Sequence, residues 1–496
     1  MSETTDTRKP RRGFLRAVTR RFGTWPLFGV ILVWVVLALV VFTVLGWLWG
    51  EGPLWSWQRW LTNWRGASAG AGSLDLVKVS LTTIGGIGGT GYLVIKYRER
   101  ASAERAERDA EQNRAEQRLL SGVQQLGSGS PQVRIAGVYS LADVADTYRG
   151  EYRQRVVSIL CGYLRTQRGE RRTIVNEQDG PEQSSEEKVY VSHDGAVEST
   201  VLEVLVRHLR KRCEKTKHRE AVTQLVEDDQ LWCDCTIDLH DAVLTEIADF
   251  RGATFNDANF RDATFNDANF QDATFNDANF QDATFNRANF WDATFTNNAD
   301  FQGATFNRDA YFWRATFTNN AYFRDATFND ANFQDATFNR DANFRGATFN
   351  DANFWDATFN DANFQDATFN RANFQDATFN DANFRGATFN DADFWDATFN
   401  DANFQDATFT NGVANFWDAT FNDANFQDAT FTNGVANFRG TTFNDANFQD
   451  ATFSRSAPPM DLPPEQVDED GLPHGARWAD ADDEGPEAGS PDDAPA

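Results

Sequence analysis

A phenylalanine recurs at almost every fifth position over nearly half of this chain, and this period limits the fold more than any other feature of the sequence. From Ala248 the sequence repeats the pattern A-[TND]-F-x-x, as in ATFND-ANFQD, as far as Phe453. Forty of the 44 phenylalanines lie on this ladder, and Leu239 and Leu244 extend it backward to 42 units. Periodicity this regular is typical of a solenoid, whose stacked units bury one continuous core.

The pattern also indicates which side chains are buried. Ala and Phe stand two residues apart, so in extended backbone they point to the same side while the residue between them points away. A period of five matches neither a plain strand nor a helix, so each unit must be a short extended piece followed by a corner. The phenylalanines of the core ladder therefore begin with Phe250, Phe255, Phe260 and Phe265.

The motif A-[DNT]-[LF]-x-x, repeated over residues 239–453, resembles the pentapeptide-repeat family. That resemblance implies a right-handed quadrilateral β-helix with four units per coil and with the Ala and Phe side chains pointing inward. The segments Leu126–Asp146 (LGSGSPQVRIAGVYSLADVAD) and Val156–Arg165 (VVSILCGYLR) resemble membrane-anchored actinobacterial members of the family. With four units per coil, the 42 units give about ten coils and a rod roughly 50 Å long.

Four units per coil also place the outward side chains in columns. The residue after the Phe is Trp in five units that all fall on one face, namely Trp291, Trp313, Trp355, Trp395 and Trp417. The opposite face has Arg or Gln at this position, as in Arg324, Arg345 and Arg385. The Trp column can be a docking stripe, because exposed aromatic rows are favourable interface material. Duplication of FWD units together with FQD and FRG units explains the column equally well.

Longer spacings interrupt the period at a few positions. Extra residues follow only the A-T-F half-units, so they are predicted to bulge at two opposite corners of the coil. The loops Thr410–Val413 and Thr432–Val435 are then expected to stack one coil apart, beside each other.

The residue types of the repeat exclude most catalytic chemistry. Between Ala248 and Phe453 there is no His, Cys, Lys, Ser or Glu, hence no standard pair of nucleophile and base and no phosphate loop. The corner aspartates, such as Asp262, Asp282, Asp366 and Asp406, lack the G-G-x-G-x-D pattern of calcium-binding β-rolls. Cys233-x-Cys235 with His240 lacks a second ligand pair at zinc-site spacing. We therefore expect no enzyme activity, no cofactor and no metal.

The charge is distributed unevenly along the chain. Of the formal −27, residues 249–450 carry 30 Asp against 11 Arg, which gives −19, and residues 454–496 carry −10. An acidic second half repels nucleic-acid phosphates, so direct binding of DNA or RNA is disfavoured.

The N-terminal region contains two candidate membrane spans. The stretch Pro26–Trp49 lies within an uncharged segment and is long enough to cross a bilayer as a helix. A basic cluster precedes it and favours a cytoplasmic N-terminus: Arg8, Lys9, Arg11, Arg12, Arg16, Arg20 and Arg21. A second uncharged segment, Val79–Ile95, is followed by three basic residues, so we expect a helical hairpin in the cell membrane with the repeat region on the cytoplasmic side.

These features divide the chain into seven parts. The predicted parts are a basic cytoplasmic N-terminus (1–24), a transmembrane hairpin (25–97), a helical stalk and helix pair (98–165), a linker (166–198), a helical cap region (199–236), the repeat β-helix (237–453) and a disordered acidic tail (454–496). Because prolines follow soon after Phe453, the last coil is expected to be uncapped. An uncapped edge makes a homodimer through the C-terminal coil plausible.

Two functions remain open at this stage. The first is a membrane-anchored, non-enzymatic scaffold that presents an acidic rod to an unknown protein partner. The second is suggested by the family resemblance, because some soluble pentapeptide-repeat proteins mimic duplex DNA and bind topoisomerases. A membrane anchor argues against the second function, since it restricts access to the nucleoid.

Overall fold

The computed structural model describes residues 71–175, 186–212 and 223–479, together with five isolated positions between Val33 and Val44. The chain divides into two compact units, Met1–Arg114 and Ala115–Ala496. Helix α4 (Ala71–Leu126) is continuous across the boundary between them. The second unit contains the helical region and the whole solenoid.

The predicted transmembrane hairpin is not found. Its second segment, Val79–Ile95, is part of the single helix α4 and is continuous with the predicted stalk. No helix among the residues that the structure describes has a stretch apolar enough to cross a membrane. Val79–Ile95 is limited to 17 residues by Lys78 and Lys96, and five of the 17 are glycines, which contribute almost no hydrophobic surface. The first segment, Pro26–Trp49, lies outside the described residues except for isolated positions.

Three further helices precede the solenoid: α5 (Pro131–Tyr148), α6 (Gly150–Arg165) and α7 (Gly195–Leu209). Helix α5 begins with Pro131 directly after Ser130, and proline is favoured at the first position of a helix. Buried aliphatic side chains on α5, α6 and α7 join these helices into one core, among them Val138, Leu141, Leu160 and Leu205.

The predicted linker at 166–198 contains a β-hairpin instead. Strands β1 (Gly169–Val175) and β2 (Glu186–Ser192) pair antiparallel, and α7 already begins at Gly195. The alternation of Val189 and Val191 with polar residues is a strand pattern. This pattern spans few residues and is surrounded by charged ones, so the sequence did not predict the two strands.

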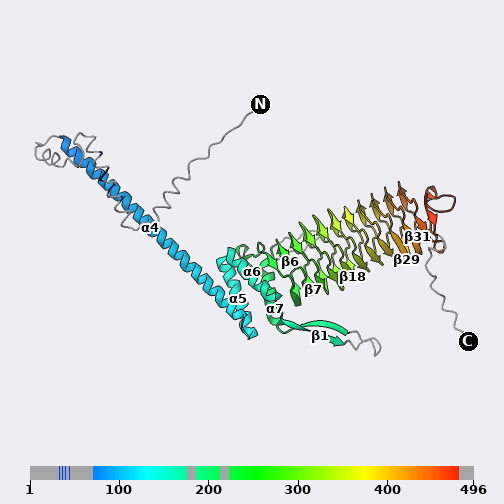
Figure 1. Cartoon of the computed structure of the whole chain (residues 1–496), viewed down its shortest axis with the longest axis horizontal. Coiled ribbons are helices and arrows are strands. Elements are labelled where there is room, and N and C mark those ends of the chain that lie inside the picture. The colour runs from blue at the N-terminus through cyan, green and yellow to red at the C-terminus, as the bar shows by residue number, and fades with distance from the viewer. Residues whose placement is uncertain are drawn as a thin grey trace. The chain divides into compact units, whose positions relative to one another are not determined.

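The solenoid is the stack of short arrows that continues from β6 past β31 in Figure 1. Four stacks of phenylalanine rings fill it, one for each side of the coil. In each stack the ring lies parallel to the ring one coil later, as in Phe250–Phe270 with 5.4 Å between centroids and Phe255–Phe275 with 4.9 Å. Thr264–Phe265 pairs with Thr284–Phe285, which sets twenty residues, or four units, per uninterrupted coil. The predicted four-sided solenoid after a helical region is therefore confirmed.

Parallel strands form three sheets along the solenoid. One has ten strands: β5 (Thr254–Phe255), β8 (Thr274–Phe275), β12 (Thr294–Phe295), β16 (Thr316–Phe317), β20 (Thr337–Phe338), β23 (Thr358–Asn360), β26 (Thr378–Asn380), β28 (Thr398–Asn400), β30 (Thr420–Asn422) and β32 (Thr442–Asn444). One has seven: β3 (Ile237–Asp238), β6 (Ala258–Asn259), β9 (Ala278–Asn279), β13 (Ala299–Asp300), β17 (Ala321–Tyr322), β21 (Ala342–Asn343) and β24 (Ala362–Asn363).

The third sheet has fifteen strands and passes around a corner onto a second side. Its members are β4 (Val243–Asp249), β7 (Thr264–Asn269), β10 (Thr284–Phe285), β11 (Ala288–Asn289), β14 (Thr305–Phe306), β15 (Ala310–Tyr311), β18 (Thr327–Asn329), β19 (Ala331–Asn332), β22 (Thr348–Asn350), β25 (Thr368–Asn370), β27 (Thr388–Asn390), β29 (Thr408–Asn415), β31 (Thr430–Asn437), β33 (Thr452–Phe453) and β34 (Arg477–Trp478). Along this sheet one ladder has twelve levels from Leu244 to Trp478, so the solenoid has about twelve turns instead of ten. The predicted stacking of the two inserted loops is also observed, since Gly412 pairs with Gly434 and Val413 with Val435.

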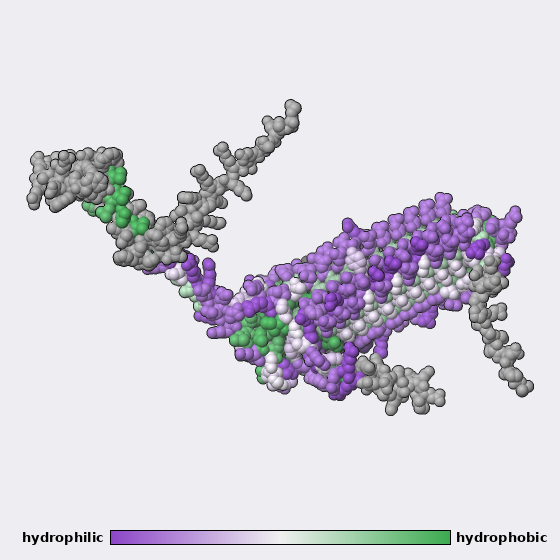
Figure 2. Space-filling model, viewed as in Figure 1, coloured by the Kyte–Doolittle hydropathy of each residue, from purple (hydrophilic) through white to green (hydrophobic). Residues whose placement is uncertain are grey.

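The corners and the outer surface explain the polar residues of the motif. Corner aspartates adopt the left-handed conformation, for example Asp262 and Asp366 with φ of 58°, which Asp tolerates better than most residues. Asparagine side chains then bond from coil to coil, as from Asn380 to Asn360 and from Asn400 to Asn380, both at 2.8 Å. Polar side chains therefore cover most of the visible side of the solenoid in Figure 2.

The N-terminal end of the solenoid is closed by the helical region. Helix α7 packs on β4 and α6 on β3. Glu198 of α7 is fully buried, and its carboxylate accepts hydrogen bonds from the backbone N–H groups of Thr245 and Glu246 at 2.6 and 3.1 Å. Arg168, also buried, forms an ion pair with Glu198 and donates to the carbonyl oxygen of Val243 at 2.8 Å. These bonds tie the helices to the first coil.

The C-terminal end is closed too, which corrects two expectations. Residues 454–479 are not disordered. Trp478 in β34 pairs with Phe453 in β33, and Met460 forms an isolated β-bridge with Asn437. The backbone N–H of Asp450 donates to the carbonyl oxygen of Gly475. The segment thus covers three of the four sides of the last coil, so the premise of an uncapped edge is wrong. Sequence reasoning missed this cap because Trp478 continues the Phe ladder only after a break of 24 residues. Residues 480–496 lie outside the described residues.

Candidate interaction surface

The five predicted tryptophans lie in a single column on one side of the solenoid. Each follows a phenylalanine of the stack that begins at Phe250 and Phe270. The outward positions of this side, in order, are Arg251, Gln271, Trp291, Trp313, Gln334, Trp355, Gln375, Trp395, Trp417 and Arg439. Backbone bonds hold neighbouring levels together, as from the N–H of Asp376 to the carbonyl oxygen of Trp395 at 2.9 Å. We refer to the five indole side chains as the tryptophan column.

Contacts between levels fix the indole rings. Trp291 stacks on Trp313 with 4.9 Å between ring centroids, and Trp395 stacks on Trp417 with 5.5 Å. Trp355 has no tryptophan on an adjacent level and is the most open of the five, with 39% of its surface exposed. The indole nitrogens of Trp313 and Trp355 donate to the carboxylates of aspartates on the next level, each at 2.8 Å. Each of the five rings therefore has a stacking or hydrogen-bonding partner on an adjacent level.

A ladder of carboxylates runs beside the column, and sequence reasoning missed it as a unit. The corner residues Asp335, Asp356, Asp376, Asp396 and Asp418 occupy five successive levels, and we call them the acidic ridge. Partial burial and the neighbouring charges of Asp335 and Asp376 raise the pKa of Asp356. Burial and the charges of Asp376 and Asp418 likewise raise the pKa of Asp396. Across the described part of the chain, no basic side chain forms an ion pair with any of the five.

Two arginine side chains lie over tryptophan rings near the two ends of this surface. The guanidinium of Arg314 lies over the ring of Trp313 at 5.9 Å and pairs with Asp292 at 3.3 Å. The guanidinium of Arg439 lies over Trp417 at 4.8 Å. Between these two arginines the column presents only Gln and Trp side chains.

The opposite side differs in its charge balance. There Arg345 pairs with Asp366 at 3.6 Å, Arg385 with Asp406 at 3.2 Å, and Arg324 with Asp325 at 3.2 Å. Asp262 pairs with Arg261. Three of the four corner aspartates considered above as calcium ligands, Asp262, Asp366 and Asp406, are therefore paired with an arginine. In the ranges that the structure describes, no three His, Cys, Asp or Glu side chains are grouped to hold a metal ion.

The three cysteines that the structure describes, Cys161, Cys233 and Cys235, are buried free thiols. Burial raises the pKa of Cys161 to about 12 and those of Cys233 and Cys235 to about 11, so these thiols stay protonated at neutral pH. His240 is hydrogen-bonded to Asp238 at 2.7 Å. As free thiols they therefore have little of the thiolate character that nucleophilic attack needs.

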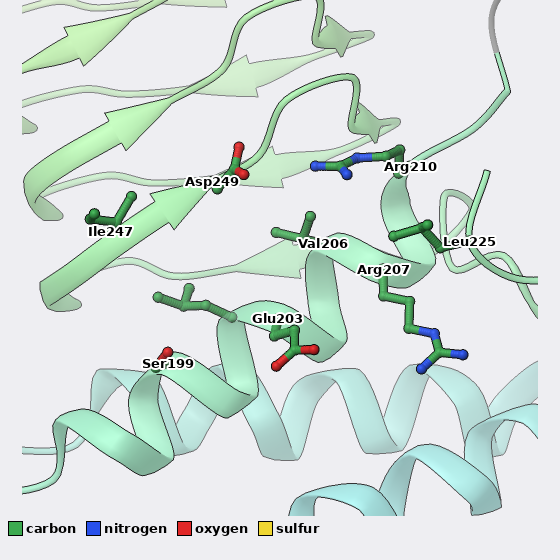
Figure 3. A pocket seen from close by; sticks show the side chains of 9 residues that line it. Ser199, Glu203, Val206, Arg207, Arg210, Leu225, Ile247 and Asp249 are labelled. Atoms are coloured by element: carbon green, nitrogen blue, oxygen red, sulfur yellow. The ribbon is translucent and has the colours of Figure 1, made fainter. Parts of the chain in front are cut away.

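A cleft of about 480 Å³ lies between α7 and β4. Its lining combines apolar Val206 and Ile247 with charged Glu203, Arg207 and Asp249. Figure 3 shows the carboxylates of Glu203 and Asp249 pointing in different directions, so they do not converge on a common point. These two carboxylates therefore do not form an acid–base pair in the cleft.

The four-sided stack of short parallel strands defines the repeat region as a β-solenoid. A family model described as pentapeptide repeats (9 copies) matches six overlapping segments and a separate seventh: 239–284, 270–316, 290–337, 312–358, 325–368, 356–398 and 416–457. The solenoid of this chain is a pentapeptide-repeat domain, as the sequence motif predicted. No curated protein matches the chain.

Several solved structures resemble parts of the chain. The plasmid-mediated fluoroquinolone resistance protein QnrB1 is 16% identical over 38% of this chain and 91% of its own, with a TM-score of 0.24. HetL, a pentapeptide repeat protein involved in heterocyst differentiation regulation in Nostoc sp. strain PCC 7120, is 16% identical over 48% and 91%, with a TM-score of 0.20. A pentapeptide repeat protein of the Arabidopsis thaliana thylakoid lumen is 26% identical over 25% and 68%, with a TM-score of 0.14. At such TM-scores these likenesses say nothing about the function of this chain.

Proposed function

We propose that this chain is a non-enzymatic interaction scaffold whose solenoid presents the tryptophan column to a protein partner. The observation that carries the proposal is that five outward indole rings share one column on a rigid stack of coils. Tryptophan is enriched among the residues that dominate binding energy. Rings already held in place by stacking and hydrogen bonds also lose little conformational entropy on binding.

Crosslinking from the column tests this proposal. A photo-crosslinking amino acid in place of Gln375, between Trp355 and Trp395, is expected to form an adduct with the partner in living cells. The double change Trp355→Gln and Trp395→Gln should reduce the yield of that adduct about tenfold or more. Tryptophan is among the residues that contribute most to binding energy at interfaces, and two of them are lost. The yield of the crosslinked band on a gel is the measurement.

The matched control places the same crosslinker at Gln405, which follows the phenylalanine on the opposite side of the coil. We expect no partner adduct from this position. Adducts of equal yield from Gln375 with and without the two tryptophans would remove the docking role of the column.

The proposal includes a membrane tether formed by the N-terminal apolar stretch. It rests on the uncharged stretch Phe22–Gly50 and the basic cluster before it. We expect the chain to stay in the membrane pellet after an alkaline carbonate wash, and a variant lacking residues 22–50 to be released. A variant lacking residues 480–496 is the control and should stay in the pellet. Release of the full chain would contradict the tether.

Mimicry of DNA toward a topoisomerase is the second candidate. The −19 charge of residues 249–450 favours it, because an acidic rod of this kind can imitate a row of phosphates. If it is correct, the purified full chain inhibits DNA supercoiling by gyrase in proportion to its concentration. Unchanged supercoiling at a large molar excess of the chain would leave the scaffold as the better proposal.

A further inference from the structure

We propose that the tryptophan column and the acidic ridge together bind an extended, arginine-rich segment of the partner protein. This inference rests on the docking role proposed above and gives the chemical class of the partner. The open part of the surface lies between Arg314 and Arg439 and contains Trp355, Trp395 and all five aspartates of the ridge.

The chain itself shows the contact that such a partner would make. At one end of the open part, Arg314 combines a position over an indole ring with an ion pair to a corner aspartate, Asp292. At the other end, Arg439 lies over Trp417 at a distance within the usual range for a cation–π contact. Guanidinium groups therefore already lie over Trp313 and Trp417, and the levels between offer further indole rings and carboxylates.

The ridge favours a cationic partner for a second reason. Its five carboxylates stand on successive coils about 4.8 Å apart, so they repel one another. Four corner aspartates of the opposite side are paired with arginines of this chain, for example Asp366 with Arg345 and Asp406 with Arg385. Burial, together with this repulsion, raises the pKa values of Asp356 and Asp396, and guanidiniums brought by a partner would relieve the repulsion. Anionic lipid surfaces and nucleic acids would increase it.

The spacing of the column favours a particular peptide register. Trp313, Trp355 and Trp395 stand on every second level, so successive members are about 9.6 Å apart. A chain in the polyproline II conformation rises about 3.1 Å per residue, so every third side chain advances about 9.3 Å on the same side. Arg314 of this chain already lies over Trp313, and an arginine at every third position of a partner can meet the rings of Trp355 and Trp395 in turn. Arginine fits better than lysine, because its planar group stacks on an indole and pairs with a carboxylate at once.

Fluorescence anisotropy with synthetic peptides tests the inference on the full chain in detergent. The probe is a labelled peptide of four Pro-Pro-Arg repeats, and the matched peptide has lysine in place of each arginine. We expect the arginine peptide to bind about tenfold more tightly than the lysine peptide, since stacking and bidentate pairing are lost with lysine. Equal affinity for the two peptides would overturn the proposed chemistry.

Two double variants separate the parts of the surface. Trp355→Gln with Trp395→Gln, and Asp356→Asn with Asp396→Asn, should each weaken the arginine peptide about tenfold. Asparagine also tolerates the left-handed corner, so the second pair keeps the coil intact. Gln365→Ala with Gln405→Ala, on the opposite side, should change nothing. Unchanged affinity in both surface variants would contradict the site.

The crosslinking experiment distinguishes the two levels of the argument. If Gln375 forms tryptophan-dependent adducts while the arginine peptide does not bind, the docking role stands and the arginine-rich partner is wrong. If the adducts do not depend on the tryptophans, the docking role fails, and this inference fails with it.

Discussion

Replacing Glu198 by alanine is expected to destabilise the junction between the helices and the solenoid by about 3–5 kcal/mol, because it leaves the guanidinium of Arg168 buried without its counter-charge. Both side chains are almost completely buried, at 0% and 4% exposure. The change also removes the acceptor for the backbone N–H groups of Thr245 and Glu246 in β4. Native-state hydrogen exchange of the β4 amides measures the loss of protection.

Two variants make this result specific. Glu203→Ala, on the exposed side of the same helix, should leave the β4 amides protected. Replacing the pair together, Glu198→Leu with Arg168→Met, should recover much of the stability, because two apolar side chains can substitute for a buried ion pair. Equal loss of protection in the Glu198 and Glu203 variants would show that the pair does not hold this junction.

Removing residues 454–496 is expected to convert the chain from a species that does not associate through its last coil into one that does. The segment occupies the edge of that coil through backbone bonds, with Arg477 donating to Ala451 at 2.8 Å and Ala479 to Phe453 at 2.9 Å. Without them a row of unpaired N–H and C=O groups faces solvent beside exposed phenylalanine rings, and such edges pair with another copy. Size-exclusion chromatography with light scattering, in detergent, measures the mass.

A variant lacking only residues 480–496 is the matched control, because it loses acidic residues and keeps the cap. Its mass should equal that of the full chain. If both truncated variants have the same mass, the segment 454–479 does not protect the edge. The end-to-end homodimer expected from the sequence stays a prediction, and with the cap in place it would need another surface or the release of this segment.

The regular part of this fold could be predicted because the same five-residue unit recurs throughout the repeat region. The spacing of Ala and Phe predicted the inward ladder from Phe250 onward, and the count of four units per coil placed Trp355 and Trp395 in one column. The offsets of the two TNGV loops predicted their pairing, which occurs between Gly412 and Gly434. In each case the partner of a residue lies one coil, or about 20 residues, away.

The rest of the candidate site could not be predicted as directly. The aspartates of the ridge are corner residues like many others, and their lack of counter-charges depends on which arginines reach them. Arg345 reaches Asp366 on the opposite side, whereas no arginine of the described residues pairs with Asp376 on this side. The β-hairpin at β1 and β2 was hidden for a related reason, since its few apolar residues give a weak pattern.

The sequence by itself therefore determined the coil, its core and the column of indole rings, because repeated nearest-neighbour contacts impose one geometry on every unit. Only the tertiary structure decided how the two ends are closed and which charges are paired. The contact of Glu198 with Thr245 joins residues 47 positions apart, and that of Trp478 with Phe453 follows a long irregular segment. Such contacts occur once, between segments that share no period, so their formation depends on packing that no repeat encodes.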